Sequence, residues 1–382
     1  MSVFRSRPAL RWLVPSAAAV VVIGGGAAAG TIAASAEPSL PERSAAQLLV
    51  DLQTAKVDGL SGTVVQTADL GLPALPGVTS GEGTADIANL IAGSNSARVW
   101  YAGETKARVA LLGKLGETDV IRNGSDVWVW QSRNNTASNY KIPAGAAEKP
   151  KALPTGVPST PQEAADAALA AIDPTTEVTT TGAAEVAGRD AYELQLRPKD
   201  KDSLIGQVSL AIDAEKKIPL RVDVYAKGAN DPAVRVAFQQ ISFTVPDDEQ
   251  FAFNPPAGAK VTTETPEKLQ EKAADAEKAA EAEKSKAPAR ADGTGPTVVG
   301  KGWTSVLVAK MPADEAAKDA AKDAPAEAQQ LTGLIDSLPK VSGTWGSGHV
   351  LQSSLFSALV TDDGRVLVGA VAPEKLYEVA GK

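Results

Sequence analysis

Few residues of this chain have the types and spacing that catalysis or metal binding requires. The chain has no cysteine and a single histidine, His349, which excludes thiol catalysis and thiolate metal sites and leaves one candidate for a triad base. Ser347 lies two residues before it in the sequence WGSGH. Residues two apart on a strand rarely bring Oγ and Nε2 together, and the nucleophile-elbow pattern is absent. We interpret this segment as a glycine-rich strand.

Two acidic groups have the residue types of cation ligands but the spacing of turns. The DDG sequence at residues 362–364 has the composition of a hairpin turn. The DDE sequence at residues 247–249 lacks the spacing of a calcium loop. The sequence also contains no phosphate-binding loop, dinucleotide fingerprint or zinc motif. We therefore expect a non-enzymatic protein with no catalytic residue, metal or cofactor.

The first 36 residues have the pattern of an export signal. Three arginines precede residue 12, the stretch from Trp12 to Ala34 is uncharged, and Ala34-Ser35-Ala36 fits a cleavage site. An uncleaved anchor is the alternative, because the uncharged stretch is long enough to span a bilayer. Either way we expect an exported, extracytoplasmic protein, in the cell envelope or secreted. The net charge of −8 argues against nucleic acid as a partner.

The elements that would position a site are mostly strands. Residues 188–256 predict four antiparallel strands and a closing aromatic segment, because apolar and polar residues alternate. The meander should therefore have one apolar face and one polar face. Its apolar positions are Tyr192, Leu194, Leu196, Val208, Leu210, Ile212, Val222, Val224, Val234, Val236 and Phe238.

The first half of the chain predicts a helix followed by short strands. The capping-box pattern from Ser39 to Glu42 predicts a helix that ends near Lys56. Strands are expected at residues 63–67, 96–101, 107–112, 118–122, 126–130 and 136–142, with a hairpin at residues 123–124. Residues 70–83 should form a loop and residues 161–172 a second helix. Trp128 and Trp130 share one face of their strand, which is either covered by protein or part of a ligand-contacting wall.

Composition divides the rest of the chain. Residues 262–294 are rich in alanine, glutamate and lysine, and we interpret them as a solvated spacer. Residues 295–382 should form a small α+β unit, with strands at residues 302–308, 342–353, 355–360 and 365–371 and helices at residues 331–338 and 376–379. The predicted domains are thus a signal peptide or anchor at 1–36, a main domain at 39–261, the spacer, and the C-terminal unit.

Four segments, taken together and in order, resemble the LolA/RseB-like superfamily of exported carriers and lipoprotein-binding regulators. They are LLVDLQTAKVDGLSGTVVQ (48–66), SARVWYAGETKARVALL (96–112), DVIRNGSDVWVW (119–130) and DDEQFAFNPPAGAKV (247–261). The alanine-rich composition is similar to that of exported actinobacterial members. In contrast to LolA carriers, the strand containing Trp100 has no arginine after it until Arg108.

The resemblance implies an α+β fold with an open antiparallel half-barrel, lid helices in its mouth, and an apolar interior that binds acyl chains. Phe251 and Phe253 would form the last inward-reaching turn of that barrel. The residues expected to line the lipid-binding cavity are Val99, Tyr101, Val109, Leu111, Tyr192, Leu194, Leu196, Val208, Leu210, Val222, Val224, Val236 and Phe238. Each could equally be ordinary core beneath a lid helix.

The function expected from this resemblance is that of an exported, non-enzymatic carrier of lipid or lipoprotein acyl chains. One alternative is an RseB-like regulator that senses lipoprotein or lipid and binds a membrane anti-sigma factor or another envelope protein, with the C-terminal unit as a contact. A second alternative is a structural protein whose apolar face is filled by its own helices.

Overall fold

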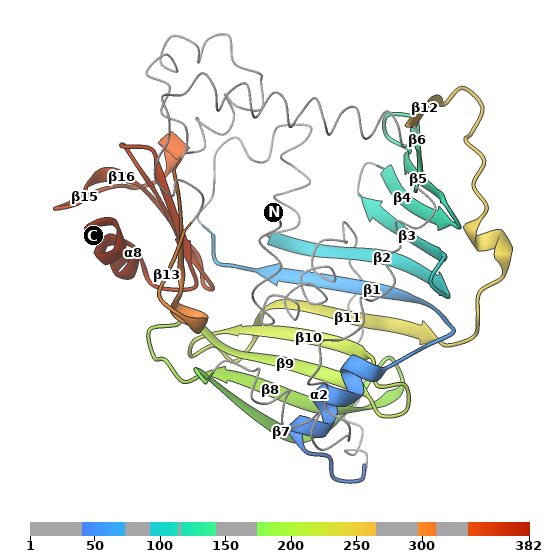
Figure 1. Cartoon of the computed structure of the whole chain (residues 1–382), viewed down its shortest axis with the longest axis horizontal. Helices are drawn as coiled ribbons and strands as arrows, with labels where there is room; N and C mark the ends of the chain where they lie inside the picture. The colour runs from blue at the N-terminus through green and yellow to red at the C-terminus, as the bar shows by residue number, and fades with distance from the viewer. Residues whose placement is uncertain (1–39, 73–91, 114–115, 143–173, 265–296, 311–334) are drawn as a thin grey trace, which may run out of the picture.

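The structure is a computed structural model that describes residues 40–72, 92–113, 116–142, 174–264, 297–310 and 335–382 (Figure 1). The expected signal segment, the helix at 161–172, most of the loop at 70–83 and most of the spacer lie outside the described residues. Within them, no helix is long and apolar enough to cross a membrane.

The first described helix, α2 (Ala45–Thr54), begins later than the sequence predicts. Its cap is Ser44, whose Oγ accepts a hydrogen bond from the Gln47 amide while the Gln47 side chain accepts one from the Ser44 amide. This reciprocal pair is a capping box with glutamine in place of glutamate. The expected cap at Ser39 is therefore wrong, because a second box five residues later satisfies the free amides of the helix.

Twelve strands form one large sheet, in the order β12-β6-β5-β4-β3-β2-β1-β11-β10-β9-β8-β7. All neighbours are antiparallel except β12 and β6, which are parallel. The strands are β1 (Gly59–Asp69), β2 (Ala92–Ala102), β3 (Lys106–Gly113), β4 (Gly116–Asn123), β5 (Asp126–Gln131), β6 (Thr136–Lys141), β7 (Thr176–Val186), β8 (Arg189–Pro198), β9 (Ile205–Asp213), β10 (Pro219–Ala226), β11 (Pro232–Ser242) and β12 (Lys260–Glu264).

The large sheet is an open antiparallel half-barrel, as expected. β1 joins its two halves by pairing with β2 on one side and β11 on the other. The hairpin between β4 and β5 turns at Gly124, whose φ of 63° suits glycine. The edge strand β7 was not predicted, because its sequence TEVTTTGAAEV has no clear alternation and its register shifts between Thr180 and Ala183.

The segment between β11 and β12 runs along the outside of the rising β3–β6 wall (Figure 1). It contains a short 3-10 helix, η2 (Asp248–Phe251), which contacts β3 and β4. β12 then adds to the free edge of β6 and extends to Glu264, into the segment expected as spacer. This segment therefore covers one face of the wall and pairs with its edge.

The C-terminal unit is a separate six-stranded sheet in the order β13-β14-β18-β17-β16-β15. Its elements are β13 (Thr297–Val299), the 3-10 helix η3 (Gly302–Thr304), β14 (Val306–Lys310), β15 (Lys340–Gly343), β16 (Gly346–Gln352), β17 (Ser357–Thr361), β18 (Arg365–Gly369) and α8 (Pro373–Ala380). The expected strand at 302–308 is thus split between η3 and β14, and the one at 342–353 is split between β15 and β16.

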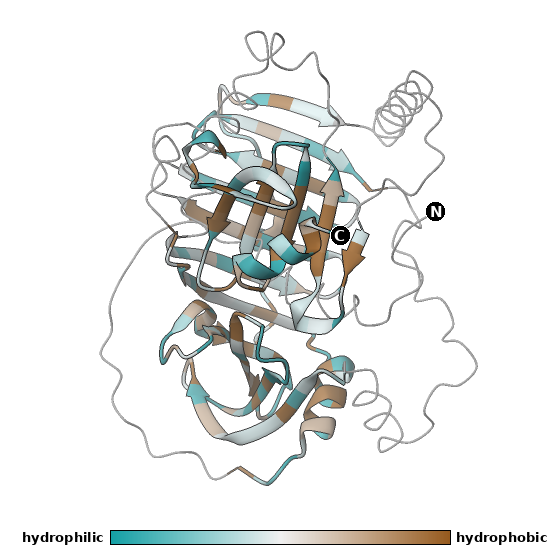
Figure 2. Cartoon of the chain, turned by 90° about the vertical axis from the view of Figure 1, so that its left-hand side faces the viewer, coloured by the Kyte–Doolittle hydropathy of each residue, from teal (hydrophilic) through white to brown (hydrophobic). Residues whose placement is uncertain are grey.

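The helix α8 supplies the core of the C-terminal unit. Leu376 and Val379 pack against Val306, Leu359 and Leu367 from the sheet. These side chains are at most 9% exposed, so one face of the small sheet is sealed. Figure 2, viewed from that side, shows α8 in front of the strands.

Hydrogen bonds hold the two sheets together at the corner where they meet. The Leu204 amide donates to the Ala370 carbonyl at 2.8 Å, and the Ser354 amide donates to the Leu70 carbonyl at 2.8 Å. Elsewhere along the contact the Trp303 indole donates to the Thr176 hydroxyl at 2.7 Å. These bonds link the C-terminal unit to the start of β7, the β8–β9 loop and the end of β1.

Candidate functional site

The register of the large sheet gathers most of the predicted cavity residues on one face. We call this the inner face; it is the face on which α2 lies, and the opposite one is the outer face. Cross-strand pairs form one row of Leu194, Leu210, Val222 and Val236, and a second row of Leu196, Val208, Val224 and Val234. Further rows pair Val64, Ala97 and Leu111, then Val99, Val109 and Val120, then Tyr101 and Ala107. Tyr192 pairs with Ile212 beside the first row.

Phe238 stands apart from the other predicted positions. It pairs with Val64 next to a register shift between β1 and β11. Its side chain packs against the buried cluster of Val186, Ala191, Ala211 and Leu220. The shift falls after Phe238, so cross-strand pairing keeps Phe238 on the inner face while its ring packs against a different cluster from the aliphatic rows. Alternation alone gives no sign of such a shift.

The helix α2 covers only part of the inner face. Leu48 and Leu49 pack against Tyr192, Leu194 and Ile212 at the β8–β9 end. Leu194 is fully buried there, whereas Val120 on β4 is 39% exposed. Between these extremes the predicted positions Val99, Tyr101, Val109 and Leu111 are half-buried. An apolar surface is thus left partly accessible over β2–β4, where burial is worth about 25 cal/mol per Å² covered.

A polar pair interrupts the inner face at its centre. Gln66 and Asn95 are buried and lie in the row that contains Val236. The Asn95 amide donates to the Gln66 Oε1 at 2.6 Å. Hydrogen bonding between them lowers the cost of burying two amides on an apolar surface. The sequence analysis missed both residues, although alternation along β2 places Asn95 on the same face as Ala97 and Val99.

The outer face of the β3–β6 wall is sealed by the segment that follows β11. Phe251 is 1% exposed, and the Phe253 ring lies 5.3 Å from the Trp128 ring and 6.1 Å from the Trp130 ring. The expectation that the two phenylalanines reach into the barrel is therefore wrong: they pack on the outside. Trp128 and Trp130 are covered by protein on that side and are not a wall of the inner face.

Arg108 joins this outer cover to the sheet. Its guanidinium lies 5.2 Å from the centre of the Trp100 ring and 2.5 Å from the Asp119 carboxylate. A second donor reaches the Gln250 carbonyl of η2. Arg108 lies on β3, directly opposite Trp100 of β2. It lies on the outer face, so its role is to hold η2 in place.

Charged residues fill the outer face of the meander. Arg235 donates to the buried Asp223 at 2.6 and 3.0 Å, and Arg221 bridges Asp223 and Glu193. Hydrogen bonding to Asp223 raises the pKa of Arg235, and burial raises the pKa of Tyr225. The meander therefore has the predicted apolar and polar faces, with a network of paired charges on the polar one.

The residues that resembled catalytic or metal-binding groups are occupied by structural contacts. Ser347 Oγ donates to Asp362, and His349 Nδ1 lies 3.0 Å from the Leu338 carbonyl. Residues 362–364 form the β17–β18 turn, with Gly364 at a φ of 83°. Among the described residues there is no cluster of three or more side chains that could bind a metal.

Comparison with known proteins matches part of the large sheet. The family model of the MucB/RseB N-terminal domain matches residues 92–261. No curated protein matches the chain.

Several solved structures are similar to the chain at low identity. The complex of MucA and MucB from Pseudomonas aeruginosa matches at 15% identity and a TM-score of 0.40, covering 88% of this chain and 96% of that one. A conserved protein from Thermus thermophilus matches at 13% identity and a TM-score of 0.32, covering 57% of this chain and 98% of that one. A LolA superfamily protein from Nitrosomonas europaea matches at 12% identity and a TM-score of 0.20, covering 56% of this chain and 99% of that one. Residues 92–261 of the chain, from β2 to the start of β12, thus match the MucB/RseB N-terminal domain.

Proposed function

We propose that this protein is exported and binds acyl chains of lipids or lipoproteins, non-enzymatically, on the inner face of the large sheet. The observation that carries the proposal is the pair of aliphatic rows on a face that α2 covers only in part. A soluble domain rarely leaves a large apolar face partly open unless it has a ligand. The match of residues 92–261 to the MucB/RseB N-terminal domain supports the same assignment.

Binding would be hydrophobic and reversible. Each methylene of an acyl chain that leaves water contributes about 0.8 kcal/mol, and a single chain gives only marginal, exchangeable attachment. Such an affinity suits a carrier, which must release what it binds.

The test is equilibrium binding of a fluorescent fatty acid to the full chain. Val109→Asp places a charge in the middle of the half-buried inner face, and Thr67→Asp places the same charge on the exposed outer side of β1. We expect Val109→Asp to weaken binding at least tenfold and Thr67→Asp to leave it unchanged. Equal effects of the two variants, or no binding by the parent protein, would reject the proposal.

A regulator is the second candidate, favoured by two observations. The matching family model is that of MucB/RseB, and the chain carries a second sheet hydrogen-bonded to the first. In this role, acyl binding would change how the protein contacts a membrane anti-sigma factor or another envelope protein. Recovery of one such membrane protein from detergent extracts, and its release on addition of lipid, would favour the regulator over the carrier.

A further inference from the structure

The small sheet has a second apolar face that α8 does not cover. Side chains alternate along each strand, so the residues between those of the α8 core point the other way. Cross-strand pairs place Val298, Leu307, Val368, Ala358 and Leu351 in one row of this face. The adjacent row contains Ala309, Val366, Val360 and His349. We call these two rows the second apolar face.

This face is accessible in the described part of the chain. Val298 is 52% exposed and Leu307 is 44% exposed, and the remaining members of both rows are half-buried. The helix α8 packs on the opposite side of the small sheet and α2 packs on the large sheet. The described helical residues 335–337 lie next to Leu338, whose carbonyl contacts His349 at the edge of this face. Eight aliphatic residues in two rows on one sheet face make a contiguous apolar patch, and such patches mark interaction sites.

The second apolar face is turned toward the large sheet. In Figure 1, α8 lies on the far side of the small sheet, away from the large one, and Figure 2 shows α8 in front when viewed from that side. The uncovered face therefore points in the opposite direction, to the side on which the β3–β6 wall rises.

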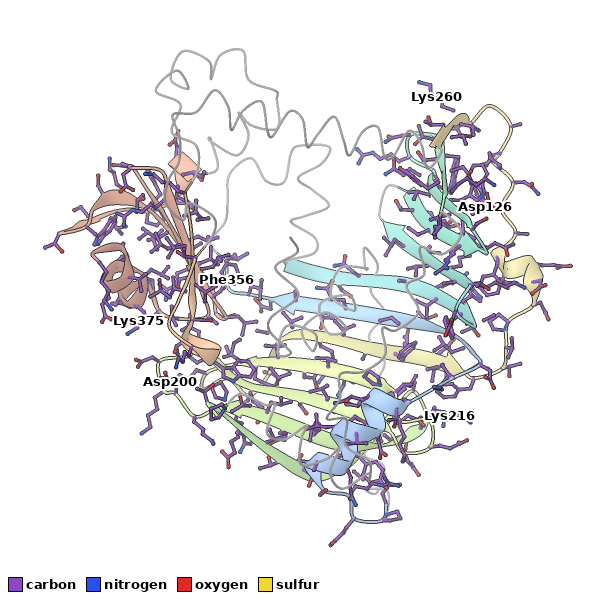
Figure 3. The ribbon with its side chains drawn as sticks, in the orientation of Figure 1. Asp126, Asp200, Lys216, Lys260, Phe356 and Lys375 are labelled. Atoms are coloured by element: carbon purple, nitrogen blue, oxygen red, sulfur yellow. The ribbon has the colours of Figure 1, made fainter. Side chains whose placement is uncertain are left out.

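The inner face and the second apolar face are continuous through the corner. Phe356 precedes β17 and has the same alternation as Ala358 and Val360. It packs against the buried cluster of Leu70, Ala233 and Leu355, and Val224 and Val234 of the inner face pack against the same cluster. Figure 3 shows Phe356 at the point where the two sheets meet. The hydrogen bonds from Ser354 and Leu204 fix this corner.

We propose that the second apolar face is the other half of the acyl-binding surface, and that its occupant is a lipid with more than one acyl chain. This inference rests on the proposed function of the inner face. The chemistry of both faces argues for hydrocarbon, because the residues in the rows named above are aliphatic except for Tyr101, Tyr192, the Gln66–Asn95 pair and His349. A single acyl chain can bind on the inner face alone, whereas a diacyl or triacyl lipid has further acyl chains that would contact Leu307 and Val368.

The experiment compares two fluorescent probes, a fatty acid and a diacyl phosphatidylglycerol, on the full chain. Leu307→Asp is the main variant, because a side chain already 44% exposed tolerates a charge without unfolding. Val366→Asp is a second variant on the adjacent row, and Thr344→Asp in the exposed β15–β16 turn is the matched control. We expect both face variants to weaken the diacyl lipid about tenfold, the loss of roughly two methylene contacts, and to leave the fatty acid within twofold.

The outcomes separate this inference from the proposed function. If Val109→Asp weakens both probes but Leu307→Asp and Val366→Asp change neither, the second apolar face does not bind lipid and the inner face still does. If the face variants instead abolish capture of an envelope protein while leaving the diacyl lipid unchanged, the face binds protein and the inference is overturned. If the parent protein binds neither probe, the proposed function and this inference fail together.

Discussion

Replacement of Leu48 by alanine tests whether α2 is docked on the inner face. Leu48 is fully buried against Tyr192, Leu194 and Ile212. Buried leucine-to-alanine changes cost about 2–5 kcal/mol, and we expect about 3 kcal/mol here because a short helix on a sheet surface relaxes into part of the space. For a unit of this size that loss corresponds to about 6–12 °C in Tm.

The assay is thermal unfolding followed by far-UV circular dichroism and tryptophan fluorescence. Gln53→Ala is the matched control, because Gln53 lies on α2 with an exposed side chain and such a change costs at most about 0.5 kcal/mol. A Leu48→Ala shift below about 2 °C, or one equal to that of the control, would refute the packing of α2 on the sheet.

Leu48→Ala also tests whether α2 is a movable lid over the inner face or a fixed part of the binding surface. If an incoming acyl chain displaces α2, weakening its contact lowers the cost of opening, and affinity for a fluorescent fatty acid should rise by at most about a hundredfold. We expect this rise. A fall in affinity would mean that α2 is a fixed part of the binding surface.

Three further predictions follow from named contacts. Phe251→Ala should cost about 3–5 kcal/mol, measured by urea unfolding, and a cost below about 1 kcal/mol would contradict a docked η2. Burial raises the pKa of Asp213, but hydrogen bonds from Arg189 and two backbone amides outweigh burial and lower the pKa, so the stabilisation by Asp213 is present above about pH 4 and is lost as pH falls through the folded pKa. Asp213→Asn should therefore be less stable at pH 7, and its free energy of unfolding should fall less steeply with pH in acid. An unchanged pH dependence in urea unfolding would count against this. Trp303→Phe should cost about 1 kcal/mol through the lost bond to Thr176, seen by differential scanning calorimetry, and no change would argue against the corner contact.

Strands with clear alternation could be predicted from the sequence because a half-buried sheet imposes a period of two. The β8–β11 meander and the β2–β6 series follow that rule, and the predicted positions share one face by their cross-strand pairing as a result. The strand β7 was not predicted, because its threonines and small residues show no apolar period. Hydrogen bonding to β8, rather than burial, places it in the sheet.

Tertiary features could not be predicted from local patterns. Phe251 and Phe253 have the same sequence signature whether they pack inside or outside the wall, and only the path of the chain after β11 decides between them. The second apolar face could have been anticipated in part. β14 reads VLVA (306–309), with no polar residue at alternate positions, and such runs belong to strands with apolar contacts on both faces.

The central claim is that the inner face binds acyl chains in the natural environment of the protein. Native mass spectrometry of the full chain, purified from its own envelope without detergent exchange, measures this directly. We predict a lipid-sized mass adduct that is lost in Val109→Asp and retained in Thr67→Asp. A spectrum with the bare protein mass alone, together with no uptake of a fluorescent fatty acid, would contradict the account and show that the apolar face is filled by the protein itself.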